Sequence, residues 1–296
     1  MLEVPALAGG RFSSTEDFYQ ALVQERFIVP SGTDGLYGRA ASFERVLGAI
    51  NDLLSNLSAV DANEQYVFPP VIDQRIVERV RYTESFPHLC GFVFCSQPES
   101  RTPVASDAVL SPAACYPIYP TLTGTLPRGG RRISMLNWVY RNEPSPDPTR
   151  LRAFRIREFV CAGGKDDADE WIASWKERCE VLARELELPT HLADASDPFF
   201  GNAGAIMTRF QRQNSLKQEL LVPLWGDRAE QHLALASINQ HREHFSRHFQ
   251  IHDCEGALAR SACVGFGLER LTLAVLAIHG LAPARWPRSV QERSSA

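Results

Sequence analysis

Residues 141–158 read RNEPSPDPTRLRAFRIRE, and strand-like segments flank the prolines in the middle of this stretch. The segments 133–143 and 150–161 are predicted to form two strands, and Pro144–Pro148 between them indicates a connection with a rigid tip. The sequence therefore predicts a hairpin here. Because residues two apart on a strand share a face, each arm should present its alternate side chains together.

The predicted hairpin carries residue types that suit a nucleotide. The candidates are Arg141 and Glu143 on one arm and Arg150, Phe154 and Glu158 on the other. A guanidinium can bridge phosphate oxygens, an aromatic ring can stack on a base, and a carboxylate can accept from the exocyclic amine of the base. An exposed sheet face with cross-strand salt bridges would show the same pattern, and the hairpin alone does not separate the two.

A second stretch, GFGLER at residues 265–270, follows a predicted strand at 257–264 and opens an amphipathic helix. Gly265 and Gly267 allow a backbone or a ligand to approach closely, and Arg270 lies where a phosphate would meet the start of the helix. The stretch is not the dinucleotide-binding fingerprint, because the third glycine and the preceding βαβ unit are missing. A purely structural turn is the alternative.

Helices and strands mix along the chain without regular alternation. Apolar residues at helical spacing predict a helix at 41–56 and another between Asp166 and Pro189. Shorter elements are expected as helices at 14–27 and 239–251, and as strands at 66–68, 219–225 and 233–237. We therefore expect an α+β fold with a largely antiparallel sheet, in a single domain over residues 1–296.

Composition limits the classes of function. The chain has 296 residues, 44% hydrophobic and 22% charged, with a formal net charge of −4, so it lacks the basic excess of a protein that grips long nucleic acid. We see no signal peptide, and the apolar stretch 271–284 is shorter than the roughly 20 residues that span a bilayer. The seven irregularly spaced cysteines argue against a disulfide framework and fit a reducing cytoplasm.

Together the two stretches resemble motifs 2 and 3 of the class II aminoacyl-tRNA synthetases. Motif 2 reads R-x-E, a loop, then R-x-x-x-F, and is matched by Arg141, Glu143, Arg150 and Phe154. Motif 3 reads G-x-G-x-E-R, and is matched by Gly265, Gly267, Glu269 and Arg270. Motif 1, a long helix and a strand ending in proline, is matched loosely by residues 41–70. The resemblance implies an antiparallel sheet flanked by helices, and a homodimer with Pro69 or Pro70 at its interface.

The resemblance also implies roles. Arg141 and Arg270 would be the catalytic residues: Arg141 would hold the α-phosphate of ATP during attack by an amino-acid carboxylate, and Arg270 would bind the γ-phosphate. Glu143 would accept from the adenine amine, Phe154 would stack on the adenine ring, and Mg²⁺ would bridge the phosphates. Arg150, Gly265, Gly267 and Glu269 would complete the ATP site. Catalysis would then be mainly positioning and electrostatic stabilisation.

A third group of residues points to a metal. Cys115, Glu158 and Cys263 come from segments next to the two motifs, and three such ligands suit Zn²⁺ with one open position. This set resembles the zinc-dependent seryl-tRNA synthetases of methanogens, in which the metal grips the amino group of the substrate. The usual T-x-E loop for that amine is not evident, because 123–125 is followed by Leu126 and Pro127. Each cysteine could instead be a small buried hydrophobe, as we expect for Cys90, Cys95, Cys161, Cys179 and Cys254.

Residues 237–252 supply further candidates. Ser237 and Asn239 echo an S-x-N segment of the seryl enzymes, so both are predicted to line the substrate site. His241, His244 and His248 fall at helical spacing on the predicted helix at 239–251, and could form a rival zinc site. The charged residues between them favour a solvated helix face instead.

Neither end of the chain is expected to hold a tRNA-binding arm or an anticodon domain. A bare core of this kind is similar to the bacterial amino acid:[carrier protein] ligases, which load glycine or alanine onto the phosphopantetheine thiol of an acyl or peptidyl carrier protein. We therefore expect a carrier protein as partner, with no tRNA and no membrane. Arg209, Arg212 and Lys217, on a predicted helical segment, are candidates for carrier docking, with a solvated helix face as the alternative.

Two other functions stay open. A minimal aminoacyl-tRNA synthetase or tRNA-modifying ligase would use the same core. A catalytically idle synthetase paralogue could serve as a regulatory subunit, but Arg141, Glu143, Phe154 and Arg270 argue against it, since such a subunit has no need of nucleotide-binding side chains.

Overall fold

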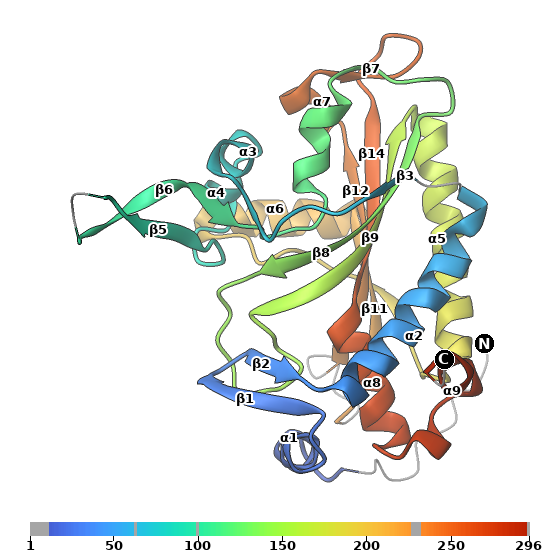
Figure 1. The fold of residues 1–296 in the computed structure, drawn as a ribbon. Helices are drawn as coiled ribbons and strands as arrows, with labels where there is room; N and C mark the ends of the chain where they lie inside the picture. The colour runs from blue at the N-terminus through green and yellow to red at the C-terminus, as the bar shows by residue number, and fades with distance from the viewer. Residues whose placement is uncertain (1–11, 62–63, 99–100, 226–231, 295–296) are drawn as a thin grey trace.

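A computed structural model describes residues 12–61, 64–98, 101–225 and 232–294, and one large sheet dominates it (Figure 1). The sheet has seven strands in the order β10-β11-β12-β14-β9-β8-β3. The β3–β8 pair is parallel, and the other neighbours pair antiparallel. In sheet order the strands are His191–Asp194, Lys217–Pro223, His232–Arg242, Arg260–Gly267, Ala153–Gly163, Arg131–Tyr140 and Glu64–Tyr66. The predicted α+β fold with a largely antiparallel sheet is confirmed.

Alternation along the two central strands gives the sheet two different faces. On one face Phe159 of β9 and Phe266 of β14 pack on Trp175 of α5, with ring centroids 4.4 and 5.7 Å from that tryptophan. The helices α2 (Ala41–Ser58), α5 (Lys165–Glu185) and α8 (Leu268–His279) cover this side of the sheet (Figure 1). Their buried apolar stripes pack the core on this side of the sheet.

The opposite face is covered by shorter pieces. A 3-10 helix, η2 (Tyr116–Leu122), and helix α7 (His244–Phe249) contact each other and the sheet. Tyr119 of η2 stacks on Phe245 of α7, with ring centroids 3.7 Å apart and planes 6° apart. These aromatic rings close that side of the sheet over β12 and β14.

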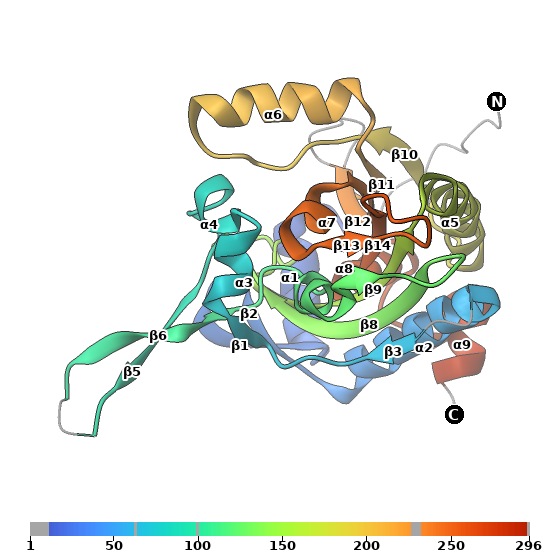
Figure 2. The ribbon, with the colours of Figure 1, turned by 90° about the horizontal axis from the view of Figure 1, so that it is seen from above.

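Smaller units surround the main sheet. Helix α1 (Thr15–Gln24) precedes the hairpin of β1 (Ile28–Thr33) and β2 (Leu36–Arg39). A three-stranded sheet of β4 (Val71–Asp73), β6 (Pro103–Leu110) and β5 (Phe92–Ser96) projects away from the body (Figure 2). The remaining helices are α3 (Gln74–Arg79), α4 (Tyr82–Ser85), α6 (Gly201–Gln213) and α9 (Arg288–Ser294), and a parallel pair joins β7 (Gly124–Thr125) to β13 (Ile251–His252). No described helix has both the length and the apolar character needed to cross a bilayer.

The long predicted helices are confirmed as α2, α5 and α8, but two local predictions are wrong. The arms of the hairpin are shorter than expected, since β8 ends at Tyr140 and β9 begins at Ala153. Proline has no N–H to donate to a ladder, and the proline-rich segment loops out instead. Arg141, Glu143 and Arg150 therefore lie on this loop rather than on strand faces.

The helix predicted at 239–251 is the second error. Strand β12 continues to Arg242, and only His244–Phe249 is helical. The reason is tertiary, because residues 236–242 find backbone partners on β14, which helical spacing alone could not reveal. His241 is therefore on a strand, and the three histidines do not share one helix face.

Candidate active site

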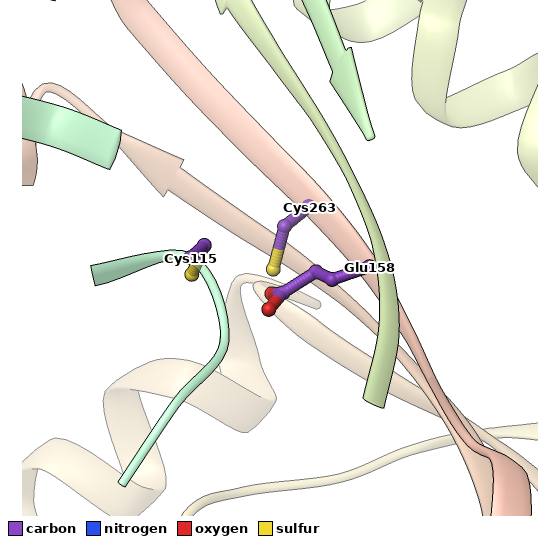
Figure 3. A group of neighbouring side chains, drawn as sticks. All are labelled: Cys115, Glu158 and Cys263. Carbon is purple, nitrogen blue, oxygen red and sulfur yellow. The ribbon is translucent and has the colours of Figure 1, made fainter. Parts of the chain in front are cut away.

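Three buried side chains meet on the face of the sheet opposite α5. Cys115 comes from the residue before η2, Glu158 from β9 and Cys263 from β14, and their side chains point toward one another (Figure 3). Their ligand atoms all lie within 4.8 Å of one another. In the described part of the chain no other group of three or more metal-ligating side chains is gathered this closely, the α7 histidines included. The structure thus brings together the three residues predicted to be metal ligands, and their binding of a metal stays a prediction.

Burial makes it unfavourable for the three groups to ionise. Burial raises the pKa of Glu158, and the contact with Cys115 together with burial raises the pKa of Cys263 well above the usual value for a thiol. The contact with Cys263 lowers the pKa of Cys115, but burial and the nearby Glu158 outweigh it, so this pKa is raised too. Oε2 of Glu158 is buried and has no hydrogen-bond partner among the described residues. A buried group of this kind is costly unless something compensates it.

The donor set fits Zn²⁺. Two thiolates and one carboxylate are three protein ligands of the types zinc prefers, and they leave a fourth position open. Space is available beside the carboxylate, because Gly265 lies opposite Glu158 in the ladder. A Cβ at this glycine would lie 3.8 Å from Oε1 of Glu158 and 3.3 Å from Ile156.

A pair of arginines lies near the cluster, since the charge of Arg141 acts to lower the pKa of Glu158 against the larger effect of burial. The guanidinium carbons of Arg141 and Arg270 are 5.9 and 6.0 Å from the centroid of the buried Phe154 ring. Arg270 donates from Nε to the carbonyl of Thr149 and from Nη1 to that of Ala234, at 3.2 and 3.3 Å. Burial, then the charge of Arg141, lowers the pKa of Arg270. Two positive groups held together over one buried ring suit an anion.

The other predicted ATP residues fall into two groups. Glu143 and Arg150 both act electrostatically on Arg270, so the loop brings them near the arginine pair. Glu269 differs, because its side chain is fully buried and its carboxylate accepts from the backbone N and the Nε of Arg155, at 2.7 and 2.8 Å. Nε of Arg39 lies 3.5 Å from the same carboxylate. Glu269 therefore joins the start of α8 to β9, and its part in ATP binding stays a prediction.

Strand β12 contributes side chains beside the thiol of Cys263. Nδ2 of Asn239 donates to Oγ of Ser237 at 3.2 Å and to Sγ of Cys263 at 3.5 Å. Nε2 of His241 is also 3.5 Å from this Sγ. Burial lowers the pKa of His241 to about 3, so the ring is neutral. The sequence interpretation missed His241 as part of this site, although Ser237, Asn239 and His241 are spaced two apart, which is the signal of a shared strand face.

Three further predictions are tested by burial. Cys90, Cys161 and Cys179 are buried, as expected, but Cys95 and Cys254 are exposed. Arg209 and Arg212 are exposed on α6. The prediction that Lys217 lies on a helix surface available for docking is wrong. Lys217 is buried on β11, and its Nζ pairs with Asp197 at 2.6 Å and Glu219 at 3.1 Å.

Comparison with known proteins identifies the family. No family model matches the chain. Two proteins of Bradyrhizobium diazoefficiens, named amino acid–[acyl-carrier-protein] ligases 1 and 2, are each 38% identical to it, over 280 and 283 residues. These alignments cover 88% of this chain, and 85% and 83% of the two relatives. The chain belongs to the amino acid–[acyl-carrier-protein] ligases.

As a member of this family the chain is an ATP-dependent ligase, in agreement with the predicted motifs. A type-2 serine–tRNA ligase of Methanopyrus kandleri is more distant, with 28% identity over 196 residues, 62% of this chain and 37% of that protein.

Solved structures give the same fold. The seryl-tRNA synthetase of M. kandleri, solved with a tRNA, superposes with a TM-score of 0.81 and 22% identity, over 97% of this chain and 61% of its own. The prolyl-tRNA synthetase of Giardia lamblia, solved with prolyl-adenylate, gives 0.72 and 15%, over 93% and 57%. The ligase therefore has the class II synthetase fold, as predicted.

Glu269→Ala should lower the free energy of unfolding by about 3–5 kcal/mol, because it leaves Arg155 and Arg39 without their buried partner. Glu44→Ala is the matched control, since Glu44 pairs with the same Arg155 but is 41% exposed, and it should cost only about 0–1 kcal/mol. Urea unfolding followed by circular dichroism measures both. Equal losses in the two variants would contradict a special role for the buried carboxylate.

Proposed function

We propose that this ligase activates a small amino acid, glycine or alanine, as its adenylate and transfers it to the phosphopantetheine thiol of a carrier protein. The observation that carries the proposal is that the Cys115, Glu158 and Cys263 cluster adjoins the pair Arg141 and Arg270. A group that binds an amine would then lie beside a group that binds phosphates. The relatives at 38% identity support it, because their names specify an amino acid and an acyl-carrier protein.

The proposed reaction has two steps. In the first, the carboxylate of the amino acid attacks the α-phosphorus of ATP, and pyrophosphate leaves with the adenylate formed. Arg141 stabilises charge at the α-phosphate, and Arg270 holds the γ-phosphate. Glu143 accepts from the adenine amine and Phe154 stacks on the base, and Mg²⁺ would supply charge neutralisation for the phosphates. In the second step the carrier thiol attacks the carbonyl carbon, a thioester forms, and AMP leaves.

The amino group is bound at the cysteine cluster. Cys115, Glu158 and Cys263 would hold Zn²⁺, which would supply a Lewis-acid contact for the amine of the substrate. Ser237 and Asn239 line the same place from β12 and help to orient the substrate. Since the amine is held in a fixed place, choice among substrates depends on the space around the side chain. One methylene is worth only about 1–3 kcal/mol in such a pocket, so both glycine and alanine can react.

A carrier protein is a better acceptor than tRNA for this chain. The formal net charge of this chain is −4, so it offers little positive charge for the many phosphate contacts that a bound tRNA needs. A carrier delivers its thiol on a flexible arm and needs only a small docking patch. Arg209 and Arg212 on α6 supply positive charge for a generally acidic carrier, next to the exposed Ile206 and Met207. We further propose that the enzyme is a cytoplasmic homodimer, formed through the segment of α2 and the edge strand β3.

A minimal aminoacyl-tRNA synthetase is the second candidate, favoured by the likeness to the serine–tRNA ligase of M. kandleri. One experiment separates the two. Pyrophosphate exchange is measured with each of the twenty amino acids, and the preferred one, labelled, is then offered with ATP to either holo-carrier protein or bulk tRNA. We expect exchange with glycine or alanine and label on the carrier thiol. Label on tRNA as an alkali-sensitive ester, with none on the carrier, would favour the synthetase.

Arg141→Ala and Arg270→Ala should each lower adenylate formation by at least about 100-fold, because each removes a charge directed at phosphate in a desolvated site. Arg288→Ala is the control, since the Arg288 side chain is 90% exposed and should not matter. Pyrophosphate exchange gives the rates, and gel filtration checks that the assembly is unchanged. Near-normal exchange in either site variant would refute the assigned roles.

Native protein should contain one zinc per chain, and Cys263→Ala should lose both the metal and the activity while keeping its fold. Cys254→Ala provides the comparison, because this cysteine is exposed and outside the cluster. Elemental analysis gives the zinc content, and circular dichroism checks the fold. Absence of zinc from the native protein, or its retention in Cys263→Ala, would show that the cluster does not hold the metal.

A further inference from the structure

Strand β12 contains a bulge at His241. Asn239 pairs with Cys263 and Gln240 with Ala262, but the next pair joins Arg242 to Ser261. His241 is thus the extra residue, and Arg242 beyond it has a positive φ of 52°. An extra residue of this kind redirects a side chain and is common next to active sites. The imidazole lies within reach of two residues of β14, Ser261 and Cys263.

The ring is held by its packing. It lies edge-on to Phe245 with centroids 4.8 Å apart and edge-on to Tyr119 at 6.1 Å. Those two rings stack on each other, so they form a rigid wall. The orientation of His241 is therefore determined by neighbours that belong to η2 and α7, and its two nitrogens face different partners.

The partners at the two nitrogens determine the tautomer. Nδ1 is 3.2 Å from the hydroxyl of Tyr119 and 3.2 Å from that of Ser261. Either hydroxyl can donate to a lone pair on Nδ1. Nε2 is 3.5 Å from Sγ of Cys263, and a metal-bound cysteine is a thiolate, which can only accept. A ring that accepts at Nδ1 and donates from Nε2 meets both demands.

We propose that His241 is a positioning residue that donates its Nε2–H to the Cys263 thiolate and so orients this ligand for the metal. Nδ2 of Asn239 donates to the same sulfur from the same strand face, so two N–H groups aim the thiolate. His241 itself is not a ligand, since its nitrogens are outside the group of ligand atoms that lie within 4.8 Å of one another. The proposal rests on the zinc site of the proposed function, and it adds a residue that the motifs do not include.

The decisive comparison is between two substitutions at one position. His241→Phe keeps a planar ring and removes the N–H, whereas His241→Gln can offer an amide N–H near the position of Nε2. Zinc affinity is measured by competition with a chromophoric chelator, and the thiolate-to-metal absorption band is recorded after replacement with Co²⁺. We expect His241→Phe to lose about 10–100-fold in zinc affinity and to shift the cobalt band, and His241→Gln to recover most of both.

Two further proteins serve as references. His248→Phe removes an imidazole from α7, away from the cluster, and should bind zinc as the native protein does. Cys263→Ala should bind no zinc. Suppose that Cys263→Ala binds no zinc while His241→Phe keeps the native zinc affinity and an unchanged cobalt band. The positioning role of His241 is then overturned and the zinc site stands. His241→Gln as weak as His241→Phe would also overturn it, and native protein without zinc would overturn both.

A third variant covers the case that His241→Phe does not fold. Tyr119→Phe combined with Ser261→Ala keeps the aromatic stack and removes both hydroxyls that face Nδ1. Without them the ring can change its tautomer, and we expect weaker zinc binding with a shifted cobalt band. Native zinc affinity in this double variant would overturn the proposal.

Discussion

The antiparallel pairing of β9 with β14 is the constraint on which the rest of the molecule depends. Its register sets Glu158 opposite Gly265 and Cys263 opposite Val160, so the carboxylate and the thiol emerge on one face with free space between them. The same register sends Phe159 and Phe266 to the other face, against Trp175. A slip by one residue would exchange the faces, burying the ligands under α5 and exposing the aromatic rings. Core packing and site geometry are therefore selected together.

A buried ion network holds the ends of these strands in place. Glu269 lies in the first turn of α8, Arg155 lies on β9, and Glu44 belongs to α2, so three elements distant in sequence are joined through one guanidinium. Glu269, although it belongs to the stretch that resembles motif 3, thus stabilises the fold. The neighbouring Arg270 instead lies over the ring of Phe154, on the side of the proposed ATP site. Adjacent residues of one helix start divide these two tasks because their side chains leave the helix in different directions.

The sequence predicted what depends on local pattern or on motif spacing. The α2, α5 and α8 helices follow from apolar periodicity, and the meeting of Cys115, Glu158 and Cys263 follows from the motifs beside them. It failed where long-range pairing overrides local preference. The spacing of His241, His244 and His248 predicts a helix, yet His241 lies on β12, at a bulge in the pairing of this strand with β14. Lys217 looks like a surface charge, yet Asp197 and Glu219 pair with it inside the protein. Such partners are invisible until the chain is folded.

The cysteine cluster is assembled from positions 115, 158 and 263, which only the folded chain brings together. An unfolded chain has no equivalent site for a cation. A cation at this site would therefore bind the folded state and not the unfolded state. At a free concentration one hundred times its dissociation constant, the cation would stabilise the folded protein by about 2.7 kcal/mol. The cell's supply of the metal would in this way regulate the lifetime of the enzyme as well as its turnover.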